Sequence, residues 1–100
     1  MKLSKDIKLE IQKSFKQRSK DAADLIQKQF TDNKMSNRII RCVIFLAEGD
    51  LEKLEHYIKI AKTDYRDVIF MAEYIEHEKK HPKRLRDFNR SFGRHDLKKI

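Results

Sequence analysis

The sequence contains few of the residues that interrupt regular backbone structure. Its 100 residues include only two glycines and one proline, and no stretch is rich in glycine, proline or serine. Flexible linkers and low-complexity segments depend on such residues, so we expect neither. A chain of this length forms one domain, and it is long enough to bury about two-thirds of the surface that its unfolded form exposes.

Cysteine is also scarce, because Cys42 is the only one in the sequence. A disulfide framework within the chain is therefore excluded, and a reducing compartment is expected. Cys42 lies in an apolar run that only Arg41 interrupts, whereas a nucleophilic cysteine needs an exposed, electropositive setting. We therefore interpret Cys42 as a small residue of the core.

Long hydrophobic runs are also missing. The longest apolar run falls well short of the ~20 residues that a membrane-spanning helix needs. The first residues, Met1 to Asp6, lead into a charged segment that has no apolar region of the kind found in secretory signals. We therefore expect a soluble, cytoplasmic protein.

Helical periodicity is what the sequence has in abundance. Residues that favour helices dominate, and no segment alternates apolar and polar residues over the length of a strand. The predicted fold class is all-α: a compact single-domain bundle of about four main helices plus a short basic C-terminal helix. Residues 1–80 are expected to form the bundle. Residues 81–100 are expected to form a basic helix or tail that packs on the same domain or extends from it.

The pair Gly49–Asp50 marks the clearest helix boundary. Glycine adopts the left-handed conformation that ends many helices, and aspartate caps the start of the next one. We predict one helix over 37–48 and another over 51–62, folded back as an antiparallel hairpin. The first of them is apolar nearly all round, which is typical of a central helix. Phe45 and Leu54 are expected to be buried neighbours across this hairpin.

Further amphipathic helices are predicted on both sides of the hairpin. A long helix begins near Lys5, and its apolar stripe weakens beside Ser19, where we expect a kink or a second helix start. The last core helix is predicted from Asp64 to about Lys80. It ends there because Pro82 pushes the preceding residue out of the helical region.

Charge is distributed unevenly along the chain, whose net charge is +8. Residues 2–20 carry seven lysines and arginines against two carboxylates, and residues 79–100 carry nine against two. Residues 21–78 carry eight against twelve. Either the basic ends fold over the acidic centre, or they form an anion-binding surface. The second interpretation predicts a small, non-enzymatic interaction or regulatory protein whose partner is a nucleic acid or an acidic protein.

The C-terminal segment supplies the candidate anion-binding residues. Pro82 at a first helical position and Gly93 as terminator predict a short helix, with an apolar stripe of Leu85, Phe88 and Phe92. If this stripe docks on the bundle, it holds the basic side chains on one side. The predicted anion-binding residues are Lys83, Arg84, Arg86, Arg90, Arg94, Lys98 and Lys99. No pattern for reading base edges accompanies them, so little sequence preference is expected.

Two aromatic residues, Phe70 and Tyr74, fall opposite the apolar stripe of the last core helix. Either a terminal segment of the chain covers them, or they form a partner or self-association surface. In the second case a homodimer is expected, because two-fold pairs are the commonest homo-oligomers. A homo-oligomeric structural protein is therefore an alternative function.

The segment His77-Glu78-Lys79-Lys80-His81 matches the zinc-binding pattern H-E-x-x-H. On a helix, histidines four residues apart share a face and can bind zinc, while the glutamate activates the bound water. A metal-dependent hydrolase is therefore another alternative. Two lysines inside the pattern and a proline directly after it argue against this function. We accordingly expect no metal ion, no cofactor and no catalytic residue.

Overall fold

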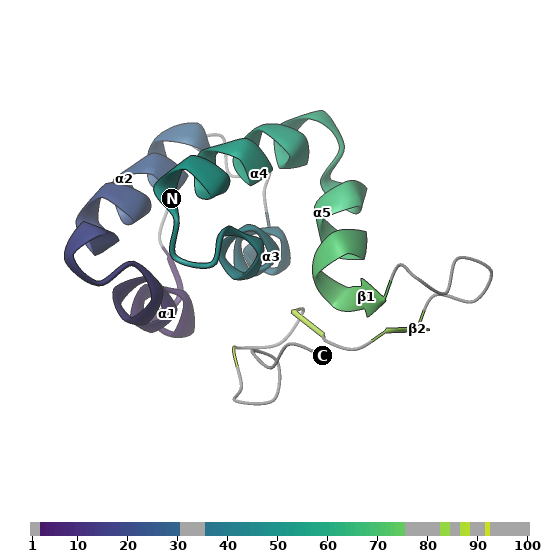
Figure 1. Ribbon diagram of the computed structural model, residues 1–100, viewed down its shortest axis with the longest axis horizontal. Coiled ribbons are helices and arrows are strands. Elements are labelled where there is room, and N and C mark those ends of the chain that lie inside the picture. The colour runs from purple at the N-terminus through teal and green to yellow at the C-terminus, as the bar shows by residue number, and fades with distance from the viewer. Residues whose placement is uncertain (1–2, 31–35, 76–82, 85–86, 89–91, 93–100) are drawn as a thin grey trace.

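Helix α3 (Asn37–Ala47) lies at the centre of the domain, with the other helices arranged around it (Figure 1). The computed structural model describes residues 3–30, 36–75, 83–84, 87–88 and 92, with the backbone alone at 75, 83 and 84. Seven of the eleven residues of α3 are buried. The predicted central helix is therefore confirmed, and so is the all-α, single-domain fold class.

The turn between α3 and α4 (Leu51–Thr63) forms as predicted. The Asp50 side chain accepts hydrogen bonds from two backbone N–H groups in the first turn of α4. Glu48 and Gly49 both have positive φ angles, +53° and +78°, which reverse the chain. A Cβ atom at Gly49 would lie 2.5 Å from the backbone oxygen of Ser14. Glycine is therefore required here by the close approach of the end of α1 as well as by its φ angle.

The N-terminal segment forms two helices that pack against each other. Helix α1 (Lys5–Phe15) is followed by the short 3-10 helix η1 (Lys16–Arg18) and by α2 (Ser19–Gln29). Lys16 has a φ angle of +51°, and the chain folds back at this point, so that α1 and α2 lie side by side (Figure 1). The second helix start predicted at Ser19 is confirmed. The buried residues of the two helices are Ile7, Ile11, Phe15, Ala22 and Ile26.

Helix α5 (Tyr65–Glu73) begins at its predicted cap, Asp64, but ends earlier than predicted. The chain continues as strand β1 (Tyr74–Ile75), which pairs antiparallel with strand β2 (Lys83–Arg84). The prediction of a helix as far as Lys80 is therefore wrong. The backbone of β1 pairs with β2, the next strand along the chain, instead of continuing the helix, and helical periodicity does not detect such strand pairing.

The predicted C-terminal helix is also wrong at the residues that the structure describes. Lys83–Arg84 is a strand, and neither Phe88 nor Phe92 is helical. Two members of the apolar stripe dock on the bundle, because Phe88 is buried and Phe92 packs half-buried against the core. Leu85 and Gly93 lie outside the described residues. The physical reason for the difference is that the Phe88 backbone bonds to core side chains, which a helix would exclude.

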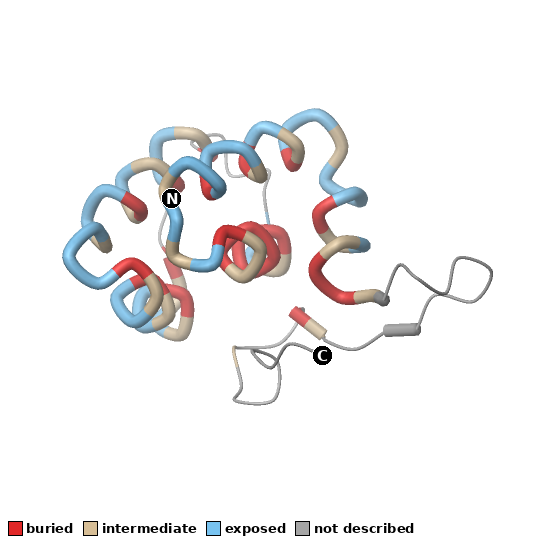
Figure 2. Tube along the Cα trace, viewed as in Figure 1, coloured by how far each residue is buried: buried red, intermediate tan, exposed pale blue. Residues whose placement is uncertain are grey.

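The core lies between the inner faces of the five α-helices described, and their outer faces are exposed (Figure 2). Leu54 is fully buried, as predicted. Phe45 is only partly buried, which contradicts its prediction. Its ring packs 5.3 Å from the ring of Phe88, so the docked C-terminal segment is one of its neighbours. Over the described part of the chain, we found no helix with the length and apolar character needed to cross a membrane.

Candidate functional site

Two ion pairs connect the central helix α3 to its neighbours. Arg41 donates from Nε and Nη2 to the two carboxylate oxygens of Asp6 on α1, at 2.8 and 3.2 Å. Arg38, one turn earlier, donates in the same bidentate way to Glu73 at the end of α5, at 3.0 and 2.8 Å. The Glu73 side chain is fully buried. The planar guanidinium matches a carboxylate in this geometry, which makes both pairs directional and strong.

The backbone of the C-terminal segment completes both ion pairs. The N–H of Phe88 donates to Glu73 Oε2 at 3.2 Å, and its carbonyl oxygen accepts from Arg41 Nη1 at 3.0 Å. The N–H of Phe92 donates to Asp6 Oδ2 at 3.1 Å. Within the part of the chain that the structure describes, no buried side-chain nitrogen or oxygen lacks a hydrogen-bond partner. The ion pairs therefore anchor the C-terminal segment on α1, α3 and α5.

The same contacts determine the protonation states of this cluster. Burial by itself raises the pKa of Asp6, but hydrogen bonds from Arg41, Ser4 and the C-terminal backbone outweigh it and hold that pKa well below its usual value. Burial raises the pKa of the Cys42 thiol well above its usual value, and the charge of Glu73, 3.9 Å away, adds to the effect. Cys42 is thus a protonated core residue, as predicted. We assign the cluster a structural role, since a nucleophile requires the thiolate.

Sequence reasoning missed both ion pairs, although one signal for them was present. Arg41 is a charged residue in the middle of an apolar helix, and a buried arginine needs an acidic partner. The partner, Asp6, lies 35 residues away, and only the packing of α1 on α3 selects it.

The structure places part of the predicted anion-binding set beside the predicted interface pair. In the β1–β2 pair, the Cα of Arg84 lies opposite that of Tyr74, and the Cα of Lys83 lies opposite that of Ile75. The other five predicted anion-binding residues lie outside the described residues; they are Arg86, Arg90, Arg94, Lys98 and Lys99.

The predicted interface residues form a stacked pair at the end of α5. The rings of Phe70 and Tyr74 are nearly parallel, with an interplanar angle of 15° and centroids 5.5 Å apart. Phe70 is 38% exposed and Tyr74 is half-buried. Of the two interpretations left open by the sequence, a covered pair and a surface pair, Phe70 fits the second.

The alternative zinc site, His77 to His81, lies outside the described residues. Among the residues that are described, no group of three or more histidine, cysteine, aspartate or glutamate side chains is placed to hold a metal ion.

A basic surface covers α1, η1 and the start of α2. We define it by six exposed residues: Lys5, Lys8, Lys13, Lys16, Arg18 and Lys20. The two carboxylates of α1 make internal bonds, because Asp6 binds Arg41 and Glu10 accepts a hydrogen bond from Ser14 at 2.8 Å, whereas Asp21 in the first turn of α2 is exposed. Across the described ranges, none of the six cations forms an ion pair. A charge count along the sequence detects the excess of cations but not the direction in which the carboxylates point.

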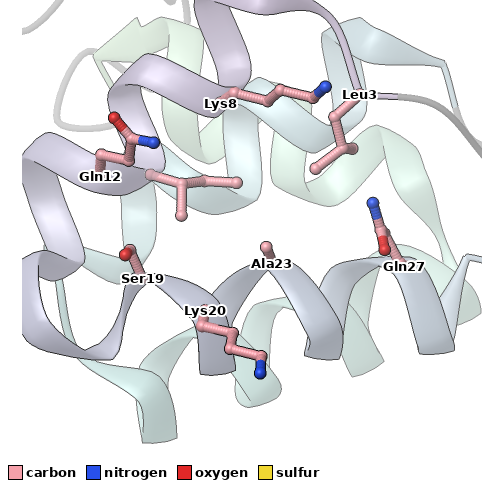
Figure 3. Close-up of a pocket in the computed structure, with 8 residues that line it drawn as sticks. Leu3, Lys8, Gln12, Ser19, Lys20, Ala23 and Gln27 are labelled. Carbon is pink, nitrogen blue, oxygen red and sulfur yellow. The ribbon is translucent and has the colours of Figure 1, made fainter.

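A groove between α1 and α2 opens within this surface (Figure 3). Its volume is about 300 Å³, and its lining residues are Leu3, Lys8, Ile11, Gln12, Ser19, Lys20, Ala23 and Gln27. Apolar side chains from both helices form its inner wall, while amine, amide and hydroxyl groups surround it, and none of the eight residues is a carboxylate. The groove can donate hydrogen bonds to an anion but supplies no evident general base. The sequence did not predict it, since it exists only because the chain folds back at Lys16.

Comparison with known proteins adds no functional assignment. No protein-family model, no curated protein and no solved structure matches this chain. The fold and the sites define a small all-α domain, in which α1 and α2 lie on one side and the end of α5 with β1 lies on the other (Figure 1). The basic surface belongs to the first side, and the stacked pair of exposed Phe70 and half-buried Tyr74 belongs to the second.

Proposed function

We propose that this is a small non-enzymatic protein that binds an anionic partner through its basic surface. The observation that supports the proposal is the imbalance at α1 and η1 and the first two residues of α2, where six cations are exposed and the two carboxylates of α1 make internal bonds. Uncompensated surface cations create a positive potential that attracts polyanions and speeds their association. The groove adds neutral hydrogen-bond donors beside these charges, which suits an oxygen-rich anion.

A nucleic acid is the partner we test first, and an acidic protein is the second. Cations spread over three helical elements suit a partner with regularly repeated negative charges. Binding without base contacts is expected in the range of about 10⁻⁴ to 10⁻⁶ M at physiological salt. If about four cations contact phosphates, the logarithm of the binding constant should fall with the logarithm of salt concentration at a slope near −3.6.

The first prediction concerns charge reversal on the basic surface. The double variant Lys8→Glu/Lys13→Glu should weaken binding to a fluorescein-labelled duplex and flatten its salt slope, because two phosphate contacts are lost. Fluorescence anisotropy in a salt titration measures both quantities. The matched control is Lys28→Glu/Lys59→Glu, which changes the net charge equally at two exposed residues outside the basic surface.

Equal effects of the two double variants would contradict a localised site and leave only a general effect of net charge. A second series reverses Arg86, Arg90 and Arg94, three of the C-terminal residues predicted to bind anions. If that series alone flattens the slope, the site lies in the C-terminal segment and not on α1. If oligonucleotides do not bind at low salt but poly-glutamate does, the partner is an acidic protein.

A further inference from the structure

The stacked pair of exposed Phe70 and half-buried Tyr74 forms an aromatic platform where α5 ends and β1 begins. This end of α5 lies on the side of the domain away from α1 and α2 (Figure 1). Its nearly parallel rings have centroids 5.5 Å apart, an offset stack of the kind that aromatic groups favour. Phe70 is one of three large apolar side chains exposed within the described ranges; the other two are Leu9 and Tyr65. A planar ligand that packs on this pair would extend a stack that already exists.

Cationic residues lie near the platform on two elements, β2 and α5. Strand β2 brings Lys83 and Arg84 alongside β1, with the Cα of Arg84 opposite that of Tyr74. Arg66 is exposed on α5 and lies one helical turn before Phe70, so that the two share a face of the helix. Arg66 is paired with Asp64 at 3.2 Å and Asp67 is exposed on the same helix, so the described residues of α5 add no excess of positive charge here. The cationic residues Lys83 and Arg84 come from β2, whose backbone pairs with β1.

We infer that the anionic partner is a single-stranded nucleic acid, and that one of its bases stacks on the Phe70–Tyr74 pair while the cations of β2 neutralise the adjacent phosphates. This inference rests on the proposed function and makes its partner more specific. Aromatic faces beside cations are the combination that proteins use for single strands, whose bases are free to stack. In a duplex the bases are already stacked inside the helix, so a duplex would gain nothing from the platform.

A second copy of the chain is the other occupant that an exposed aromatic pair suggests, and charge disfavours it. Two copies facing each other through this site would bring β2 of one close to β2 of the other, with two cations on each strand. Like charges that approach each other oppose association. A nucleic acid instead brings phosphates of the opposite charge to these cationic residues.

The experiment compares a labelled oligo-deoxythymidine with a duplex of the same length, using the full chain. Replacement of Phe70 by leucine keeps an apolar side chain but removes the ring. We expect it to weaken single-strand binding about 5- to 100-fold and to leave duplex binding unchanged. The variant Phe70→Tyr keeps the ring and should restore single-strand binding. The matched control is Tyr65→Leu, which removes an exposed ring from another side of α5.

Other results of these binding measurements would contradict the stacking of a base on the Phe70–Tyr74 pair. If Phe70→Leu binds oligo-deoxythymidine like the unaltered protein, the inference is wrong, while a salt-dependent affinity that responds to Lys8 and Lys13 would leave the proposed function standing. Equal loss of single-strand and duplex binding would also overturn stacking. Sedimentation of the protein alone provides a further check, because a dimer that Phe70→Leu abolishes would assign the pair to self-association. If neither oligonucleotide binds at low salt, the inference fails, and the proposed function fails with it only if poly-glutamate does not bind either.

Discussion

At the scale of single residues, the interior depends on two arginines that share one face of α3. Arg38 and Arg41 each hold a carboxylate from another helix, and the backbone of Phe88 bonds to both pairs. Such groups are costly to bury unless every charge is paired and hydrogen-bonded. This requirement makes the cluster specific, because a wrongly packed alternative would leave a charge without its partner.

The pKa of Asp6 predicts how stability depends on pH. Its folded-state pKa lies below its usual value of about 3.9, so its contribution is complete above about pH 4 and is lost as the pH falls below that value. In this acidic range the Asp6 carboxylate is protonated in the unfolded chain but stays ionised in the folded protein. The variant Asp6→Asn should therefore reduce the free energy of unfolding at neutral pH and flatten its decline in acid.

Urea unfolding followed by circular dichroism at several pH values measures this effect. Asp21→Asn, which removes an exposed carboxylate of α2, is the control and should leave the acid-dependent decline in place. A decline in acid that is identical in Asp6→Asn and in the unaltered protein would show that the Asp6–Arg41 pair does not contribute to pH-dependent stability.

At the scale of elements, the boundary between α3 and α4 is set by local chemistry and by a tertiary contact together. Asp50 caps α4 through two backbone N–H groups, which sequence alone suggests. Gly49 has a second reason for being glycine, since its backbone approaches the end of α1. The turn is therefore also a packing site between the N-terminal helices and the central hairpin.

Substitution of Gly49 tests this double requirement. In Gly49→Ala, the backbone of the alanine must keep the left-handed conformation. Its new Cβ atom would also lie 2.5 Å from the backbone oxygen of Ser14. We expect a loss of about 2 kcal/mol or more in the free energy of unfolding, since the left-handed conformation alone costs about 1–2 kcal/mol. Urea unfolding measures it, and Gln17→Ala, at an exposed residue of η1, should change stability by less than about 0.5 kcal/mol. A loss as small as that of the control would mean that the α1–η1 end moves away at little cost.

At the scale of the whole molecule, the C-terminal segment is part of the core and not an appended tail. Phe88 is fully buried, and its ring contacts those of Phe45 and Phe92 at centroid distances of 5.3 and 5.5 Å. The segment thus joins α1, α3 and α5 through both backbone and side chain.

Truncation of Phe88 measures how much this docking contributes. Phe88→Ala should lower the free energy of unfolding by about 3–5 kcal/mol, the usual cost of removing a buried phenylalanine ring. Phe92→Ala makes the same chemical change at a half-buried position and should cost less. Chemical denaturation of the two variants provides the comparison. Equal and small losses, below about 0.5 kcal/mol, would show that the segment does not contribute to the folded core.

Much of the helical architecture was predictable from the sequence because its causes are local. Helix caps at Asp50 and Asp64, the glycine turn and the apolar character of α3 depend on neighbouring residues and on a period of 3.6 residues. The second start at Ser19 follows from the weakened apolar stripe, and the buried Cys42 from its apolar surroundings. The caps and the apolar character of α3 do not depend on how the helices pack, so the sequence by itself determined them, whereas the choice between a kink and a second start at Ser19 and the contact of Gly49 with α1 needed the folded structure.

Only the tertiary structure decided the features that join segments distant in sequence. The docking of Phe88 depends on two ion pairs that link helices 35 residues apart. Two nearer features also needed the folded structure, namely the strand pair that follows Glu73 and the groove formed by the reversal at Lys16. The basic surface arises in the same way, because the inward orientation of the Asp6 carboxylate leaves the lysines of α1 uncompensated. Periodicity and charge counts are one-dimensional quantities, whereas the partner of a buried charge and the orientation of a carboxylate are selected by packing in three dimensions.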